Sequence, residues 1–193
     1  MSFRRSIFTI FSFFLIIFFL STNPINANYV WTEHPIPGGI LPWYSITSSS
    51  DGTKLAAVAP GNYIYTSSDS GATWTTQTSA GLRSWQVITS SSDGTKLAAV
   101  VNGGYIYTSS DSGVTWTEQT GSGSRDWQVI TSSSDGTKLA AHPRNGYIYT
   151  SSDSGATWTA QTSAGSRDWD SITSSSDGTK LAAVAYNNYI YTS

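Results

Sequence analysis

Short runs of apolar and β-branched residues, separated by polar turns, recur along the chain from residue 43 onward. In residues 85–126 four such runs cover residues 85–90, 96–100, 105–109 and 115–120, and all are rich in Thr, Ile, Val, Tyr or Trp. Runs of this kind, bounded by Gly, Asp and Ser, predict β-strands, here named A to D. Asp93-Gly94 between A and B, and Asp111-Ser112-Gly113 between C and D, predict tight hairpins.

The same pattern returns with a 42-residue period. The Trp residues at the start of strand A keep this spacing, as do the Asp residues of the A–B turn: Trp43, Trp85, Trp127 and Trp169; Asp51, Asp93, Asp135 and Asp177. We divide the chain accordingly into repeat 1 (41–82), repeat 2 (83–124), repeat 3 (125–166) and repeat 4 (167–193). Four short strands in each such period match one blade of a β-propeller. A β-solenoid is the alternative, but its repeats are usually shorter.

Repeat 4 stops after its C strand, and the missing D strand has a counterpart near the other end of the chain. Residues 29–33 have D-strand character and precede the first A strand. The sequence therefore predicts an all-β fold, a β-propeller of about four four-stranded blades, closed by pairing of residues 29–33 with residues 189–193. A fragment of a larger propeller, and a half ring that dimerises into eight blades, are alternatives that keep the blade and change the closure.

The N-terminal segment, residues 1–27, has the layout of a signal peptide. Arg4 and Arg5 precede residues 7–20, of which twelve of fourteen are apolar, and the small residue Ala27 follows a polar stretch. A membrane-spanning helix needs about 20 apolar residues, so a retained anchor is the lesser alternative. We expect two segments, a signal peptide at 1–27 and the propeller domain at 28–193, and a secreted or extracytoplasmic protein.

Composition excludes several classes of function. Thirty-four Ser and 25 Thr, against few strong helix formers, argue against a helical protein, and a formal net charge of −2 indicates no basic surface for nucleic acid. The absence of Cys excludes disulfides, thiolate metal sites and a Cys nucleophile. His34 and His142 are too far apart in sequence to make a zinc cluster unaided, and no cofactor is predicted.

The C–D hairpins carry a recognisable motif. Residues 67–74 read Ser-Ser-Asp-Ser-Gly-Ala-Thr-Trp, and the pattern Ser-x-Asp-x-Gly-x-Thr-Trp recurs at 109–116 and 151–158. The chain resembles the Asp-box (BNR) repeat propellers of the sialidase superfamily over residues 28–193. We interpret the motif residues as structural, with Asp accepting turn amides and Trp covering the turn: Asp69, Gly71, Trp74, Asp111, Gly113, Trp116, Asp153, Gly155 and Trp158.

Candidate binding residues lie on the opposite face. In an up-and-down blade the A–B and C–D turns share one face, here named the turn face, whereas the B–C and D–A connections share the other, the loop face or top rim. Three arginines repeat just before strand A, and the B–C loops differ between repeats. The predicted ligand-binding residues are Arg83, Arg125, Arg167, Arg144 and Tyr186.

These features predict a non-catalytic binding or scaffold propeller that recognises a glycan or another extracellular macromolecule. A sialidase-like glycosidase is the first alternative, because the resemblance implies three arginines that hold a carboxylate. It also implies a Tyr nucleophile with a Glu partner and an Asp acid/base, and neither these nor a glycosidase carboxylate pair can be assigned here, so no catalytic residue is proposed. A protein assembly factor is the second alternative, and an oligomer is compatible with all of them.

Overall fold

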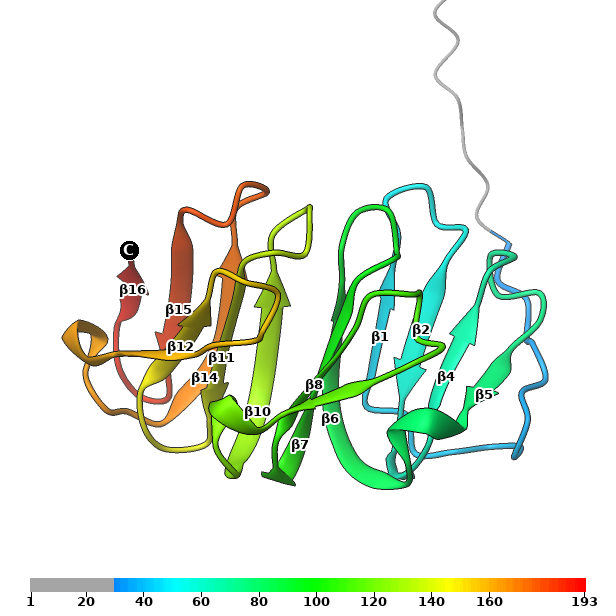
Figure 1. Cartoon of the computed structure of the whole chain (residues 1–193), viewed down its shortest axis with the longest axis horizontal. Coiled ribbons are helices and arrows are strands. Elements are labelled where there is room, and N and C mark those ends of the chain that lie inside the picture. Colours follow the sequence, from blue (N-terminus) through cyan, green and yellow to red (C-terminus); the bar gives the residue numbers. More distant parts are fainter. Residues whose placement is uncertain (1–29) are drawn as a thin grey trace, which may run out of the picture. The chain divides into compact units, whose positions relative to one another are not determined.

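The computed structural model describes residues 30–193, so the predicted leader at 1–27 lies outside the described residues. Within Glu33–Ser193 each repeat forms an antiparallel set of strands, and these sets follow one another in chain order (Figure 1). Short pairings between repeats 2 and 3 join their strands into one larger sheet. None of the described residues is α-helical. No helix in the described part is long and apolar enough to cross a membrane.

Repeats 1 to 3 each contain the four predicted strands. Repeat 1 has β1 (Ser45–Ser48), β2 (Leu55–Val58), β4 (Ile64–Ser67) and β5 (Thr75–Gln77). Repeat 2 has β6 (Arg83–Ser90), β7 (Leu97–Gly104), β8 (Ile106–Ser109) and β9 (Thr117–Gln119). Repeat 3 has β10 (Arg125–Ser132), β11 (Leu139–Pro143), β12 (Ile148–Ser151) and β13 (Thr159–Gln161). Strands A to D thus pair as a meander, with one-turn 3-10 helices (Thr78–Ala80, Thr120–Ser122 and Thr162–Ala164) after each D strand.

Repeat 4 has three strands, namely β14 (Trp169–Ser174), β15 (Leu181–Ala185) and β16 (Ile190–Thr192). Among the described residues β16 pairs with β15 alone. Residues 30–33, which lie in the segment predicted as a D strand, belong to no strand. The predicted ring closure by pairing of residues 29–33 with 189–193 is therefore not confirmed.

The core lies between successive sheets. Each of three apolar clusters combines B- and C-strand residues of one repeat with A- and B-strand residues of the next. In the first cluster Ile64 of β4 contributes from repeat 1, and Trp85 and Ile88 of β6 contribute from repeat 2. The small Ala pair in every B strand lets neighbouring sheets approach closely. The alternation of side chains along each strand thus gives a sheet that is apolar on both sides.

Short backbone pairings on the loop face also join neighbouring repeats. The B–C loop of repeat 1 contains β3 (Pro60–Asn62), which pairs with the start of β6. The loop end of β7 pairs with the start of β10 through Arg125, and an isolated bridge joins Gly146 to Arg167. These pairings lengthen strands A and B beyond their predicted ends. The loop residues have no strand pattern in their side chains, but their backbone groups hydrogen-bond to the next repeat.

Candidate functional site

The turn face and the loop face form as the repeat pattern predicts. On the turn face, the C–D hairpin of each complete repeat hydrogen-bonds to the A–B turn of the same repeat. The Ser112 amide donates to the Thr95 carbonyl at 2.8 Å, and the equivalent bonds are present in repeats 1 and 3. The A–B hairpins stand along the upper edge of Figure 1. The two kinds of Asp-bearing turn therefore lie side by side.

Each C–D hairpin is organised around its Asp carboxylate. In repeat 2, Asp111 accepts hydrogen bonds from the Thr115 amide at 2.9 Å, the Thr115 hydroxyl at 2.5 Å and the Ser109 hydroxyl at 2.8 Å. The Gly113 amide donates to Ser109 Oγ at 2.9 Å, and the Trp116 indole donates to the Gly113 carbonyl at 2.8 Å. Gly113 has φ near +90°, a conformation that favours glycine. The carboxylate, glycine and indole all serve the turn itself.

Hydrogen bonding lowers the pKa of these Asp residues. Donation from the Thr73 hydroxyl, followed by the Thr73 amide and the Ser67 hydroxyl, lowers the pKa of Asp69 to about 2. The same donors in repeat 3 lower the pKa of Asp153 to about 2, and those in repeat 2 lower the pKa of Asp111. The charged form is thus stabilised by the hairpin, which is the behaviour of a satisfied structural carboxylate.

The A–B turns repeat this arrangement with other donors. Asp93 accepts from the Ser91 hydroxyl at 2.6 Å and from the Thr95 amide at 3.0 Å, and these bonds lower its pKa to about 2. Among the described residues no group of three or more His, Cys, Asp or Glu is placed to hold a metal ion. The oxygens of these carboxylates are occupied by donors of their own turn.

Asp111→Ala is expected to lower the free energy of unfolding by about 1 to 2 kcal/mol. The substitution leaves the Thr115 amide and two hydroxyls without their acceptor. Because the site is exposed, water can replace part of these hydrogen bonds, so the expected loss of stability lies at the low end of the range for a lost hydrogen bond. Urea denaturation followed by Trp fluorescence measures it. Asp168→Ala is the control, because it removes the same charge from a carboxylate that makes no hydrogen bond to the described residues. Equal stability of the two variants would contradict the structural role.

On the loop face the three repeated arginines lie against their own repeats. Arg83 stacks over the Tyr107 ring at 4.4 Å, Arg125 over Tyr149 at 4.5 Å, and Arg167 over Tyr191 at 4.5 Å. The Nε of each arginine also donates to a carbonyl of the preceding 3-10 helix, at distances of 2.9 to 3.3 Å. Each guanidinium is therefore held between the preceding 3-10 helix and a Tyr ring of its own repeat.

The structure brings together two of the five predicted binding residues. Arg125 and Arg144 line one hollow of about 190 Å³ on the loop face of repeat 3, with Asp126 and Tyr149 in the same wall. Arg144 Nε lies 3.7 Å from the Asp126 carboxylate, and both side chains are largely exposed. Tyr186 occupies the position of Arg144 in repeat 4 and is 68% exposed. Arg83 and Arg167 do not line this hollow.

A Tyr–Glu–Arg cluster in repeat 2 was not predicted. The Tyr107 hydroxyl donates to the Glu118 carboxylate, and Arg83 Nη2 lies 3.9 Å from Glu118. Tyr107 is buried, and this burial together with the Glu118 hydrogen bond raises its pKa. A Tyr nucleophile needs a lowered pKa or an accessible base, so the cluster favours a structural role. The sequence contains one feature that could have indicated this cluster. Glu118 lies opposite Tyr107 on the neighbouring strand, and the equivalent positions in the other described complete repeats have Thr or Ala.

No family model matches the chain, and a comparison with curated proteins finds no match. Several solved structures are similar in fold. A GH74 enzyme from Niastella koreensis shares 19% identity, with a TM-score of 0.61 over 81% of this chain and 24% of that chain. YCF48 bound to D1 peptide shares 18% identity, with a TM-score of 0.58 over 78% of this chain and 49% of that chain.

A nidogen/laminin complex shares 14% identity, with a TM-score of 0.61 over 74% of this chain and 56% of that chain. The chain thus spans about a quarter of the GH74 enzyme and about half of the other two proteins. At these identities the likeness concerns the fold alone. The GH74 and YCF48 structures are β-propellers, and the chain has a β-propeller fold.

Proposed function

We propose that the protein is a non-catalytic binding or scaffold propeller whose loop face holds a carboxylate-bearing segment of another protein. The observation that carries the proposal is the hollow on repeat 3, where Arg125 and Arg144 converge beside a single acidic group, Asp126. Guanidinium groups suit carboxylates because their N–H donors match the two carboxylate oxygens. The loops that form this face also carry most of the differences between otherwise similar repeats.

The neighbouring guanidiniums extend this surface. Arg83 and Arg167 keep the same position in their repeats as Arg125, and each is fixed by a carbonyl and a Tyr ring. Donors that are already fixed lose little conformational freedom when a ligand arrives. Tyr186 adds an exposed aromatic ring in the next repeat. An extended segment that crosses repeats 2 to 4 would therefore meet donors at regular spacing.

The similar structures support this class of function. One is YCF48 bound to D1 peptide, and another is a nidogen/laminin complex, so propellers of comparable fold bind peptides or protein partners. The Asp-box motif and the signal-peptide layout support two further parts of the proposal. The chain is an Asp-box (BNR) repeat propeller, and it acts outside the cytoplasm. Binding sites on loops held by a rigid scaffold are a common arrangement.

A glycan is the second candidate ligand. Tyr44 and Tyr186 are 61% and 68% exposed, and exposed aromatic rings suit the apolar face of sugars. The similar GH74 enzymes keep a sialidase-like or other glycosidase activity as an alternative. The raised pKa of Tyr107 counts against its use as the nucleophile of such an enzyme.

Binding of the chain to immobilised acidic peptides, basic peptides, sialylated glycans and neutral glycans tests the proposal. We expect preference for acidic peptides, and a loss of roughly tenfold to a hundredfold in affinity for Arg144→Ala, since a charge-assisted contact contributes about 1.5 to 3 kcal/mol. Lys96→Ala on the turn face is the matched control, with the same loss of charge and no expected change in affinity.

Selective binding of glycans would favour the second candidate, and hydrolysis of a fluorogenic sialoside would favour the enzyme. Equal losses in Arg144→Ala and Lys96→Ala would indicate a diffuse charge effect and contradict a loop-face site. Arg144 is suited to this test because 65% of its side chain is exposed, so that its removal leaves no cavity.

A further inference from the structure

The inner part of the contact between successive repeats uses the same residue types at all three junctions of the described chain. The leading side of a repeat contributes a Trp and an Ile of strand A: Trp85 and Ile88, Trp127 and Ile130, Trp169 and Ile172, each at most 5% exposed. The trailing side of the preceding repeat contributes an Ile of strand C: Ile64, Ile106 and Ile148, each at most 6% exposed. A leading side and a trailing side therefore form one complementary interface, built three times.

The two ends of the array expose one half each of this interface. We name Trp43, Ile46, Leu55 and Ala57 of repeat 1 the leading face, and Ala182, Val184 and Ile190 of repeat 4 the trailing face. Ile46 is 64% exposed and Trp43 is 39% exposed, whereas Ile190 is 74% exposed. Their counterparts at the three formed junctions are buried. Both faces are apolar, and each repeats residue types that are buried at the formed junctions.

Backbone and side-chain contacts on the turn face show the same complementarity. The Ser50, Ser92 and Ser134 amides each donate to the Ser carbonyl one repeat further on, at 2.7 Å. The series leaves the Ser176 amide as a donor at one end and the Ser50 carbonyl as an acceptor at the other, among the described residues. Ser50 and Ser176 would complete the series if the trailing face met a leading face.

At each junction, a glycine in the A–B turn of one repeat packs against the Lys side chain of the repeat before it. A Cβ added to Gly94, Gly136 or Gly178 would lie 2.8 Å from the Cβ of the Lys one repeat earlier. Gly52 of repeat 1 has nothing within 4 Å of this position. Lys180 of repeat 4 is the Lys that has no following turn in the described chain. Gly52 and Lys180 are thus a second unmatched pair.

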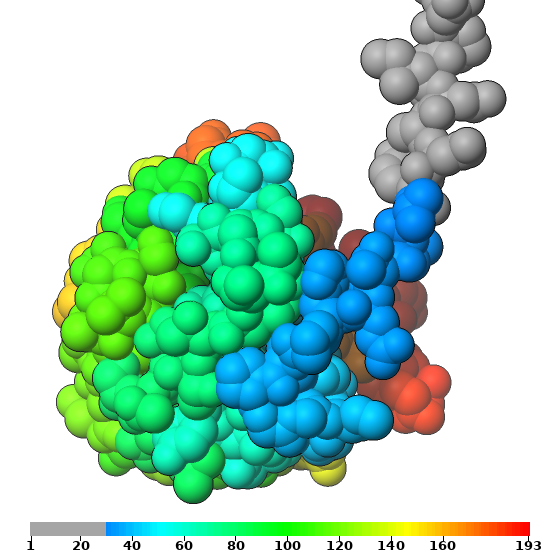
Figure 2. All heavy atoms as spheres, turned by 90° about the vertical axis from the view of Figure 1, so that its right-hand side faces the viewer, coloured from blue at the N-terminus to red at the C-terminus, as the bar shows by residue number. Residues whose placement is uncertain are grey.

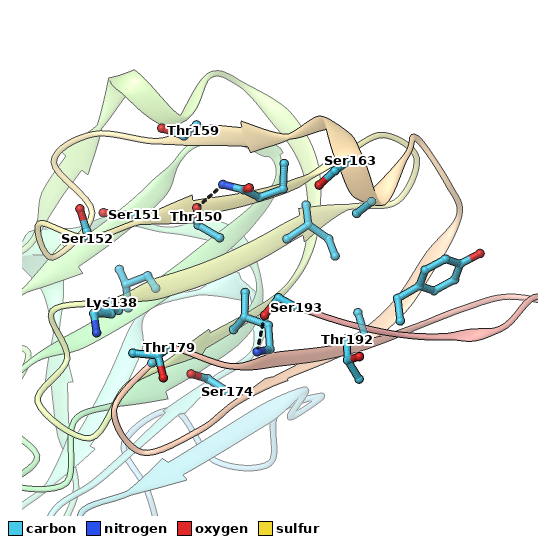
Figure 3. A pocket seen from close by; sticks show the side chains of 18 of the residues that line it. Lys138, Thr150, Ser151, Ser152, Thr159, Ser163, Ser174, Thr179, Thr192 and Ser193 are labelled. Carbon is cyan, nitrogen blue, oxygen red and sulfur yellow. Dashed lines mark hydrogen bonds between the residues drawn. The ribbon is translucent and has the colours of Figure 1, made fainter.

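The outer part of the last junction lacks one strand. Between repeats 3 and 4 lies a groove of about 690 Å³, lined by strands β12, β13, β15 and β16 (Figure 3), whereas the matching grooves at the first and second junctions hold about 340 and 130 Å³. At those junctions the C–D hairpin of the following repeat narrows the groove, and Trp116 or Trp158 packs on the cluster. The third cluster contains no such Trp.

We propose that a second copy of this chain completes the array, with the leading face of each copy on the trailing face of the other. The three formed junctions bury their apolar residues, whereas Ile46 of the leading face and Ile190 of the trailing face stay exposed in the single chain. Figure 2 shows residues near 40 and the C-terminal residues on the same side of the view, which is where a second array would attach. Two such contacts related by a two-fold axis close a ring without leaving an exposed sheet edge.

The second copy also supplies the missing D strand. In repeat 2, Thr108 pairs with Thr117 and Tyr107 with Glu118. The corresponding register places Thr32 of one copy beside Thr192 of the other, and Glu33 beside Tyr191. Glu33 would then accept a hydrogen bond from Tyr191, as Glu118 accepts one from Tyr107. Trp31 would enter the groove of Figure 3 at the position that Trp116 has in repeat 2.

Light scattering after size-exclusion chromatography tests the proposal. The full chain is expressed with its own N-terminal segment (1–27) and purified after any processing of that segment by the cell. The wild type should have twice the mass of one chain. Ile46→Asp and Ile190→Asp, which each place a charge in one face, should each have the mass of one chain. Leu82→Asp is the control, because Leu82 is 59% exposed outside both faces, and it should keep the double mass.

Mixing the two variants gives the sharpest outcome. Each variant retains one intact face, so an equimolar mixture of Ile46→Asp and Ile190→Asp should recover the double mass through one unmodified junction. Circular dichroism of each variant verifies folding, which is expected because both positions are exposed in the single chain. A wild type with the mass of one chain, an open series of larger masses, or a mixture without recovery would overturn the two-copy ring.

Discussion

Trp127→Ala is expected to lower the free energy of unfolding by about 3 to 5 kcal/mol, the range for removing a large buried aromatic side chain. Trp127 is 0% exposed and packs between repeats 2 and 3 with Val100 and Ile106. Its ring meets Tyr149 edge-on at 5.3 Å, and its Nε1 donates to the Gly123 carbonyl at 3.2 Å. Urea denaturation measures the loss.

Trp127→Phe is the matched control. It keeps an apolar ring at the junction and removes the indole N–H, so it should lose less than half as much stability as the Ala variant. A loss below about 1 kcal/mol for Trp127→Ala would mean that the junction between repeats does not carry the fold. Equal losses for both variants would assign the effect to the Gly123 hydrogen bond instead of the packing.

His142→Val is expected to stabilise the protein, by about 1 to 3 kcal/mol at pH 5. His142 is 0% exposed, at a position where repeats 1, 2 and 4 have Val, and its Nε2 is buried without a hydrogen-bond partner in the described residues. Burial lowers its pKa. The unfolded chain therefore binds a proton more readily than the folded protein below about pH 6.5, and stability falls as the pH decreases through that value.

Thermal melting at pH 5 and pH 8 measures this effect. The stabilisation by His142→Val should be larger at pH 5, because the variant no longer has the group that takes up the proton on unfolding. His34→Gln is the control, since it removes an imidazole that is exposed instead of buried. A His142→Val variant that is less stable at both values would show that the imidazole fills space that Val leaves empty.

The 42-residue period and the turn residues were sufficient to predict the β-propeller fold class and the strand meander. Asp-Gly turns and alternating β-branched residues act locally, so they can be read without knowledge of distant contacts. The joint between β3 and β6 could not be predicted, because Pro60 and Gly61 have no strand-like side chains. The predicted closure by residues 29–33 is not confirmed, because residues 30–33 belong to no strand although their side chains have a strand pattern.

The candidate site was predictable in position and less so in geometry. Equal spacing places Arg83, Arg125 and Arg167 at one height, and the structure confirms equivalent positions. Sequence spacing cannot show that each guanidinium turns onto a Tyr of its own repeat, since that choice depends on cross-strand packing. The pairing of Arg144 with Asp126 likewise depends on a loop conformation without a sequence signature.

The central claim is that the Asp residues of the turn face stabilise the fold, whereas the arginines of the loop face serve the proposed ligand binding. Parallel measurement of melting temperature and affinity for acidic peptides, in Asp111→Ala and Arg144→Ala, tests it most directly. Asp111→Ala should melt at a lower temperature and bind as the wild type does, and Arg144→Ala should melt as the wild type does and bind at least tenfold more weakly. Lost binding with unchanged melting in Asp111→Ala, or unchanged binding in Arg144→Ala, would contradict the claim.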